Sequence, residues 1–146
     1  MTEVLIKRLS KNIELPKYET KGSSGMDLSA NVEKQIKIEP GKTSIIPTGI
    51  SVSIPKNFEI QIRSRSGLAA KSQISVLNSP GTIDADYRGE LKVILINLSN
   101  KTFVVEKGTR IAQMVLCPIV KAKFKEVDNL DDTDRGVGGF GSTGLK

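Results

Sequence analysis

Short runs of alternating apolar and polar residues, separated by turn signals, constrain the fold of this chain more than any other feature. A period of two is typical of β-strands that bury one face. The clearest runs are residues 35–39, 50–54, 58–63, 91–98, 102–106 and 111–120. Between them, turns are predicted at Pro40-Gly41, Pro55, Asn100-Lys101 and Lys107-Gly108. We therefore expect an all-β sandwich or barrel.

Helical periodicity is nearly absent. No stretch of ten or more residues shows a 3.6-residue period, and the one short helix candidate is residues 67–71. The length of 146 residues suits a single domain, and there is no internal repeat. No apolar run approaches the length of a membrane span and no targeting segment is visible. We expect no membrane partner.

The C-terminal part of the chain has a different composition. Four aspartates and then five glycines fill much of residues 128–144, which cannot build a hydrophobic core. We expect a β domain over residues 1–127 and a flexible tail over residues 128–146. The tail is either a frayed terminus or a segment that wraps a ligand with Arg135 and Phe140.

Charge and residue types exclude several classes of function. The net charge of +6 favours anionic partners. However, the basic residues are scattered and aromatic residues are only 4% of the chain, so we expect no nucleic-acid partner. The absence of histidine excludes Ser-His-Asp triads and imidazole metal sites. The single cysteine, Cys117, lies in an apolar run and predicts a buried thiol in a cytoplasmic protein.

The densest polar cluster is residues 81–90, Gly-Thr-Ile-Asp-Ala-Asp-Tyr-Arg-Gly-Glu. It is either a solvated loop or a site with a carboxylate base beside an aromatic ring and an arginine. Because histidine is absent, a carboxylate is the natural group to activate water. On a regular strand Asp84 and Asp86 would share one face, so composition does not choose between them.

A second candidate lies where the run 58–63 leads into the predicted helix, at Arg65-Ser66-Gly67. Ser66 is either an ordinary helix N-cap or part of a phosphate-binding cradle with the arginine and the glycine amide. Taken alone, Asp27 fits a turn into a strand, and Gln113 fits an outward-facing strand position.

Five segments, in this order and spacing, resemble the five motifs of the homotrimeric dUTPase family. They are residues 25–28 (Gly-Met-Asp-Leu), 65–67, 81–90, 110–114 (Arg-Ile-Ala-Gln-Met) and 135–144. Together they span nearly the whole chain. One departure is Ser64, where many family members have proline. The resemblance implies a β jelly roll with one short helix, and a homotrimer whose three active sites are shared between subunits.

The resemblance also implies a function. The chain would be a dUTP diphosphatase that hydrolyses dUTP to dUMP and pyrophosphate, which limits uracil incorporation into DNA and supplies dUMP for dTMP synthesis. Asp84 would activate the water that attacks the α-phosphorus. The cofactor Mg²⁺ would be bound mainly by substrate oxygens, and Asp27 would reach the metal through water.

Further site residues follow from the same resemblance. The phosphate chain would be held by Arg65, Ser66, Gly67 and Gln113. A hairpin from Asn78 to Lys92 would contact the substrate, with uracil bound largely by Asn78 and by backbone groups near Thr82 and Ile83. Tyr87 would lie under the sugar and exclude a ribose 2′-hydroxyl. The tail would supply Arg135 for the terminal phosphate, Gly141 among the glycine amides for the same anion, and Phe140 to cover the base.

Two other functions stay open. The related dCTP deaminases share the fold, although the C-terminal glycine-rich motif and the segment Asp84–Tyr87 favour a dUTPase. A basic β-barrel that binds nucleic acid or a regulatory protein is the non-enzymatic alternative.

Overall fold

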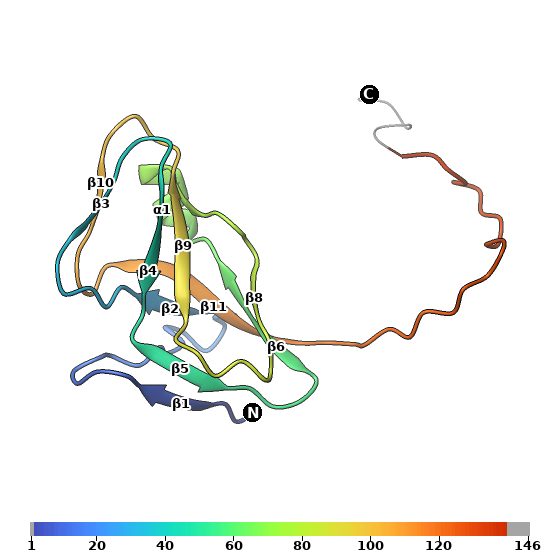
Figure 1. The fold of residues 1–146 in the computed structure, drawn as a ribbon, viewed down its shortest axis with the longest axis horizontal. Helices are drawn as coiled ribbons and strands as arrows, with labels where there is room; N and C mark the ends of the chain where they lie inside the picture. The colour runs from blue at the N-terminus through green and yellow to red at the C-terminus, as the bar shows by residue number, and fades with distance from the viewer. Residues whose placement is uncertain (1, 140–146) are drawn as a thin grey trace.

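A computed structural model describes residues 2–139 of the chain (Figure 1). Within that range it has eleven strands and one helix. The strands are β1 Leu5–Arg8, β2 Met26–Ser29, β3 Ile36–Ile38, β4 Thr43–Pro47, β5 Ile50–Ser53, β6 Phe58–Arg63, β7 Ile74–Val76, β8 Gly81–Ile83, β9 Lys92–Asn97, β10 Phe103–Val105 and β11 Arg110–Pro118. The helix α1 is Ser66–Ser72. The all-β class with one short helix is confirmed.

The strands form two larger sheets and two ribbons. One sheet has the order β2-β11-β6-β8 and the other β4-β9-β7, while β1 pairs with β5 and β10 pairs with β3. All pairs are antiparallel. Antiparallel sheets with one apolar face each must pack those faces together, which gives the sandwich expected from the sequence.

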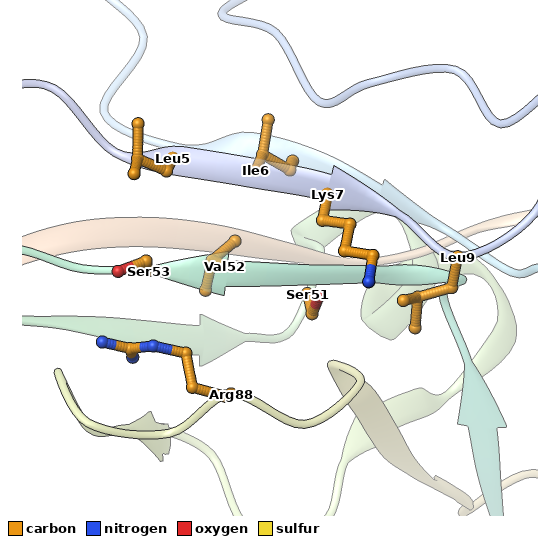
Figure 2. A pocket seen from close by; sticks show the side chains of 8 residues that line it. All are labelled: Leu5, Ile6, Lys7, Leu9, Ser51, Val52, Ser53 and Arg88. Carbon is orange, nitrogen blue, oxygen red and sulfur yellow. The ribbon is translucent and has the colours of Figure 1, made fainter.

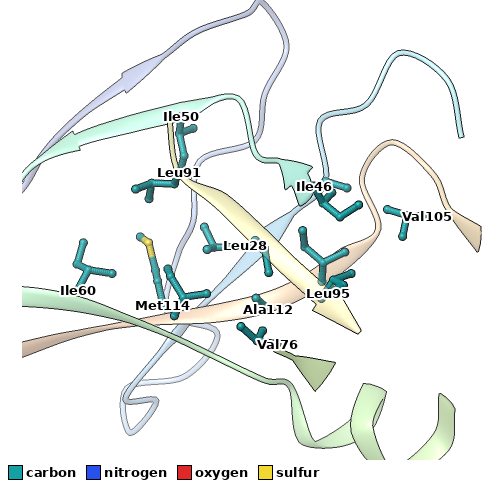
Figure 3. Packing of buried hydrophobic residues seen from close by; sticks show 14 of the residues in the cluster. Leu28, Ile46, Ile50, Ile60, Val76, Leu91, Leu95, Val105, Ala112 and Met114 are labelled. Atoms are coloured by element: carbon teal, nitrogen blue, oxygen red, sulfur yellow. The ribbon is translucent and has the colours of Figure 1, made fainter. Parts of the chain in front are cut away.

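The hydrophobic core lies between the two sheets. Alternate residues of β9, among them Val93 and Leu95, are fully buried. They belong to one hydrophobic cluster with Ile60 and Met114 of the other sheet, and Figure 3 shows Leu95, Ile60 and Met114 in this cluster. Burying such aliphatic side chains stabilises a fold by roughly 1.5–3 kcal/mol each. The position of the functional loops is therefore set by strands that are anchored in this core.

Two details of the sequence interpretation are wrong. Residues 78–92 do not form a hairpin, because β8 pairs with β6 while β9 pairs with β4 and β7. The segment instead crosses from one sheet to the other. Cys117, expected to be a buried thiol, is only half-buried, because its side chain faces away from the core. Its Sγ lies 3.6 Å from Arg63 Nη2.

The chain leaves the body after β11. The Ile119 N–H donates to Asn57 O at 2.8 Å, and residues 120–137 are exposed and form no helix or strand. In Figure 1 this segment extends away from the sheets. Within residues 2–139, no helix has the length and apolar character needed to cross a membrane.

Candidate active site

A carboxylate held between two arginines forms the first part of the site. Asp27, in the middle of β2, accepts a hydrogen bond from Arg65 Nε on Oδ1 at 2.9 Å. Its Oδ2 accepts from Arg110 Nη1 at 3.2 Å. The two cations come from the start of α1 and the start of β11, so the carboxylate ties three elements together. Two guanidinium groups against one carboxylate leave a net positive charge here.

Gln113 joins this cluster through the sheet register. On β11 it lies opposite Asp27 on one side and Arg63 on the other. Its Nε2 donates to Ser64 O at 3.1 Å, which holds the backbone just before Arg65. A Cβ on Gly25 would lie 2.5 Å from Gln113 Oε1, so the missing side chain at Gly25 makes room for the amide.

The backbone before α1 is fixed by Ser64. Its Oγ accepts the Val76 N–H at 2.9 Å and lies 3.1 Å from Ser75 Oγ in a second hydrogen bond. These bonds attach the loop to β7 at the position where many family members have proline. A serine can thus hold this backbone by hydrogen bonds instead of a ring.

The start of α1 shows whether Ser66 is the helix N-cap. The N-cap residue is Arg65, with extended backbone, and among the described residues no side chain hydrogen-bonds that cap. Ser66 is the first helical residue, so its interpretation as the N-cap is wrong. Ser66 and Gly67 are both exposed, and a Cβ on Gly67 would meet nothing within 4 Å.

The second part of the site is formed by the segment that follows β8. A pocket of about 180 Å³ is lined by Thr82, Ile83, Asp84, Tyr87, Glu90 and Lys92. Asp84 is exposed and follows the last residue of β8. The Tyr87 N–H donates to Asp84 O at 3.1 Å, which closes a turn over these four residues. Asp84 and Asp86 therefore lie in a turn and not on one face of a strand.

Asn78 lies beside this second group. It is exposed, and its Nδ2 would be 3.2 Å from a Cβ on Gly81, the first residue of β8. The structure thus brings together the residues that were expected to contact base and sugar.

Within one chain, the two groups lie toward opposite ends of β6. Ile83 pairs with Ile60, whereas Arg63 pairs with Gln113. Because β8 runs antiparallel to β6, the chain moves away from Arg63 as it passes from Ile83 to Asp84. The levels of Asp84 and Arg63 differ by four residue steps along β6, which is roughly 13 Å. Arg65 lies further along the same direction. The phosphate-binding candidates and Asp84 of a single chain are therefore far apart.

The tail residues are not brought to either group. Arg135 lies in the exposed segment, where its Nε donates to Gly138 O at 2.9 Å (Figure 1). Phe140 and Gly141 lie outside the described residues.

A separate pocket of about 380 Å³ lies along β1 and β5 (Figure 2). It is lined by Leu5, Ile6, Leu9 and Val52 together with polar side chains that include Arg88. None of the predicted site residues in residues 2–139 contributes to it.

Two further residues lie in the candidate site although no role was expected for them: Arg110, which contacts Asp27, and Glu90, which lines the pocket. Arg110 opens the motif at 110–114, but its contact with Asp27 joins residues 83 positions apart. Glu90 closes the polar cluster 81–90, and in the structure its Oε2 lies 3.9 Å from Lys92 Nζ.

Known proteins match the whole chain. A family model described as dUTPase matches residues 11–144. The deoxyuridine 5′-triphosphate nucleotidohydrolase of Rickettsia bellii is 56% identical in an alignment 146 residues long that covers 99% of this chain and 97% of that protein. The enzyme of the same name from Fusobacterium nucleatum is 51% identical over 145 residues, 99% of each chain.

A solved structure gives the same result for the fold. The dUTPase of Staphylococcus bacteriophage 80alpha, as a point mutant with dUpNHpp, superposes with a TM-score of 0.89 at 28% identity. The match covers 99% of this chain and 100% of that chain. This likeness confirms the predicted jelly roll, and the sequence matches confirm the resemblance drawn from the five motifs. The chain belongs to the dUTPase family.

Proposed function

We propose that this chain is a dUTP diphosphatase, which hydrolyses dUTP to dUMP and pyrophosphate. The carrying observation is the cluster in which Arg65 and Arg110 share the Asp27 carboxylate. Its excess positive charge suits a polyanion such as a triphosphate. Family membership supports the specific substrate, and this reaction would limit uracil incorporation into DNA and supply dUMP for dTMP synthesis.

The phosphate chain binds at this cluster in our proposal. Arg65 is oriented by Asp27, and Gln113 holds the loop before it through Ser64 O. The exposed Ser66 and Gly67 offer a hydroxyl and open backbone next to the same arginine. Preorganised donors of this kind stabilise developing charge without rearrangement during the reaction.

The base and sugar bind at the second group. Thr82, Ile83 and Lys92 line the pocket that would take uracil, and Asn78 lies next to Gly81 at the start of β8. Hydrogen-bonding groups set for uracil reject cytosine because buried groups would be left unpaired. Thymine is excluded by its methyl group. Tyr87 is 44% exposed, so one part of its ring is free to contact the sugar and exclude a 2′-hydroxyl.

Asp84 acts as the general base. Its exposed carboxylate accepts a proton from water while the water oxygen bonds to the α-phosphorus. The bond from that phosphorus to the bridging oxygen breaks, and pyrophosphate leaves. A positioned base contributes roughly 10²–10⁴ in rate. Most of the remaining acceleration then comes from positioning and charge stabilisation.

Mg²⁺ is the proposed cofactor, and it neutralises phosphate charge when bound. Asp27 fits contact through water better than direct ligation, because both carboxylate oxygens already accept from arginines. Each oxygen keeps a second lone pair for a bond from metal-bound water. Mg²⁺ commonly retains several waters and binds mainly through substrate phosphates.

The active site is shared between subunits of a homotrimer. The separation of Asp84 from Arg65 within one chain supports this, since a single subunit offers the base and the phosphate cradle at different ends of β6. Three copies in a ring can bring one subunit's Asp84 to its neighbour's Arg65.

We further propose that residues 128–146 form a tail that closes over a site of the β domain at residues 1–127. Arg135 would contact the terminal phosphate, Gly141 would donate its amide, and Phe140 would cover the base. The exposed segment 120–137 makes this arm long enough to leave the body of its own subunit.

A free cysteine also suits a cytoplasmic location.

One assay tests the function. Pyrophosphate production is measured from dUTP, dTTP, dCTP and UTP, with Mg²⁺ or with EDTA. We expect strong selectivity for dUTP and loss of activity in EDTA. Ammonia release from dCTP would support the deaminase alternative, and salt-sensitive DNA binding without nucleotide hydrolysis would support the non-enzymatic one.

A further inference from the structure

Glu90 makes a hydrogen bond that the proposed mechanism does not use. The Gly49 N–H, in the turn between β4 and β5, donates to Glu90 Oε1 at 2.8 Å. The Glu90 side chain is 24% exposed. A charge-assisted bond at this depth holds two segments that lie 41 residues apart in the sequence.

The next residue is attached to the same corner. Leu91 O accepts from the buried Thr48 Oγ1 at 2.6 Å, and the Leu91 N–H donates to Ile50 O at 2.9 Å. Leu91 itself is buried in the core. The C-terminal end of the segment that carries Asp84 and Tyr87 is thus attached to the β4–β5 turn. The Glu90 side chain contributes one hydrogen bond to this attachment.

Tyr87 is held directly by this attached end. Its O–H donates to Glu90 O at 3.0 Å. The ring also lies against Gly89, because a Cβ there would overlap the phenol oxygen and lie 2.5 Å from Cζ. One hydrogen bond and one close backbone contact therefore set the direction of the ring.

We infer that Glu90 is a positioning residue for sugar selection: its bond to the Gly49 amide fixes the backbone that orients the Tyr87 ring. This inference rests on the proposed function, because it assigns the discrimination between dUTP and UTP to a ring that Glu90 and Gly89 hold in place. Glu90 itself need not contact the substrate. A ring free to turn aside would leave room for the 2′-hydroxyl.

A matched pair of substitutions at Glu90 separates the effect of side-chain length from the effect of charge. Glu90→Gln keeps the side-chain length and an oxygen for the Gly49 N–H, but it removes the charge. Glu90→Asp keeps the charge, but the carboxylate is one methylene too short. The rival explanation is that Glu90 acts through Lys92, whose Nζ lies 3.9 Å from Glu90 Oε2. This explanation depends on the charge of Glu90.

The readout is the ratio of kcat/KM for dUTP to kcat/KM for UTP, measured on one preparation. This ratio does not depend on the fraction of folded enzyme, so lost stability alone does not move it. We expect Glu90→Gln to stay within about twofold of the wild-type ratio and Glu90→Asp to lower it about tenfold. Gly89→Ala, which displaces the ring directly, lowers the same ratio and serves if Glu90→Asp does not fold.

A double substitution tests whether Glu90 acts through Tyr87. In a Tyr87→Ala background, Glu90→Asp should leave the ratio unchanged, because the oriented ring is gone. The matched control is Glu39→Asp, which shortens a carboxylate that accepts from Thr102 Oγ1 at 2.6 Å in the β3–β10 ribbon. Its ratio should equal that of the wild type.

Three results would overturn the inference while the proposed function stands. The first is a wild-type ratio in both Glu90→Asp and Gly89→Ala, and the second is a Glu90→Gln ratio as low as that of Glu90→Asp. The third is a double variant in which the fold-changes in the ratio caused by Glu90→Asp and by Tyr87→Ala multiply. Failure of the wild-type chain to hydrolyse dUTP would instead reject the proposed function and the inference together.

Discussion

At the scale of single residues, the site depends on polar groups that hold one another before substrate arrives. Asp27 orients Arg65 and Arg110, and Gln113 holds the backbone that precedes Arg65. A donor that is already oriented loses less side-chain entropy when it binds phosphate. In the proposed phosphate site, Asp27 would therefore orient the two arginines.

The base proposed at Asp84 is tested by Asp84→Asn. The amide is nearly isosteric but does not take a proton from water, so dUTP binding should persist while kcat falls by roughly 10²–10⁴. Single-turnover kinetics and nucleotide titration measure the two effects separately. Asp86→Asn is the matched control in the same turn, and we expect a smaller loss of kcat. Equal losses in the two variants would reject the assignment.

Gly25 is a second residue-scale test, on the phosphate side of the site. In Gly25→Ala the new Cβ would lie 2.5 Å from Gln113 Oε1 and 3.3 Å from Met114 O, so the amide must move. We expect kcat/KM for dUTP to fall about tenfold or more as the hold on Ser64 O weakens. Gly22→Ala is the control, because a Cβ there meets nothing within 4 Å. Unchanged activity in Gly25→Ala would show that Gln113 is not needed in its observed position.

At the scale of elements, strands inside the clearest alternating runs could be predicted from the sequence, including the three-residue β3 and β10, whereas strands outside those runs could not. The run at 58–63 is β6 with the same bounds, and the run at 91–98 contains β9. The strand β1 was missed because all four of its residues are exposed, and β8 was missed because its three residues lie in a polar cluster. Such strands exist because a partner strand is present, which local pattern does not reveal.

The candidate site shows the same limit. Periodicity places Gln113 on a strand, but the contact between Arg65 and Asp27 joins residues 38 positions apart. Only the register of β2, β11 and β6 brings them together. The roles of these residues came from the order of five family motifs, because no local rule indicates which strands will be neighbours.

The loop before α1 gives a stability prediction. Ser64→Ala removes the acceptor of the Val76 N–H and the bond to Ser75. We expect the free energy of unfolding to fall by about 1–3 kcal/mol. Urea unfolding at one fixed protein concentration measures it, since subunit association also contributes to stability. Ser53→Ala, at the half-buried end of β5, is the comparison and should change the midpoint little. An unchanged midpoint in Ser64→Ala would mean that water replaces both bonds.

The tail is tested by removing residues 135–146. Residues 120–137 are exposed and contribute nothing to the core, so the body should assemble and unfold as before. Catalysis should fall by a large factor, because the arginine, the glycine amides and a stacking contact worth roughly 1–3 kcal/mol are lost. Substrate binding must also supply the free energy that orders a glycine-rich segment. Phe140→Ala should show a milder form of the defect, whereas full activity after truncation would return the tail to an ordinary disordered terminus.

At the scale of the whole molecule, the most informative feature is the separation of the two groups of candidate site residues within one chain. Asp84 and Arg65 lie toward opposite ends of β6, and the intervening strand is anchored in the core through Ile60 and Ile62. A local rearrangement that closed the gap would have to break a sheet. In the proposed trimer, assembly of identical subunits would bring the same two groups together without breaking a sheet.

Mixing two inactive variants tests this arrangement. Asp84→Asn and Arg65→Ala are each expected to be nearly inactive alone. After subunit exchange, a site that takes Asp84 from the Arg65→Ala chain and Arg65 from the Asp84→Asn chain is intact. Random exchange at equal amounts gives a correct pair in about one quarter of sites if the two groups come from different subunits. The expected activity is therefore about 25% of the wild-type value per site.

The control for that experiment is a mixture of the Asp84→Asn chain with a chain that carries both substitutions. No intact site can form there, so any recovery would come from contamination or from Asp84 being dispensable. Subunit exchange is confirmed by mass spectrometry of differently tagged chains, which keeps a negative result meaningful. If exchange is complete and the first mixture stays as inactive as its parents, each site takes both groups from one subunit. That result would require a rearrangement of the sheet that brings Asp84 to Arg65 within a single subunit.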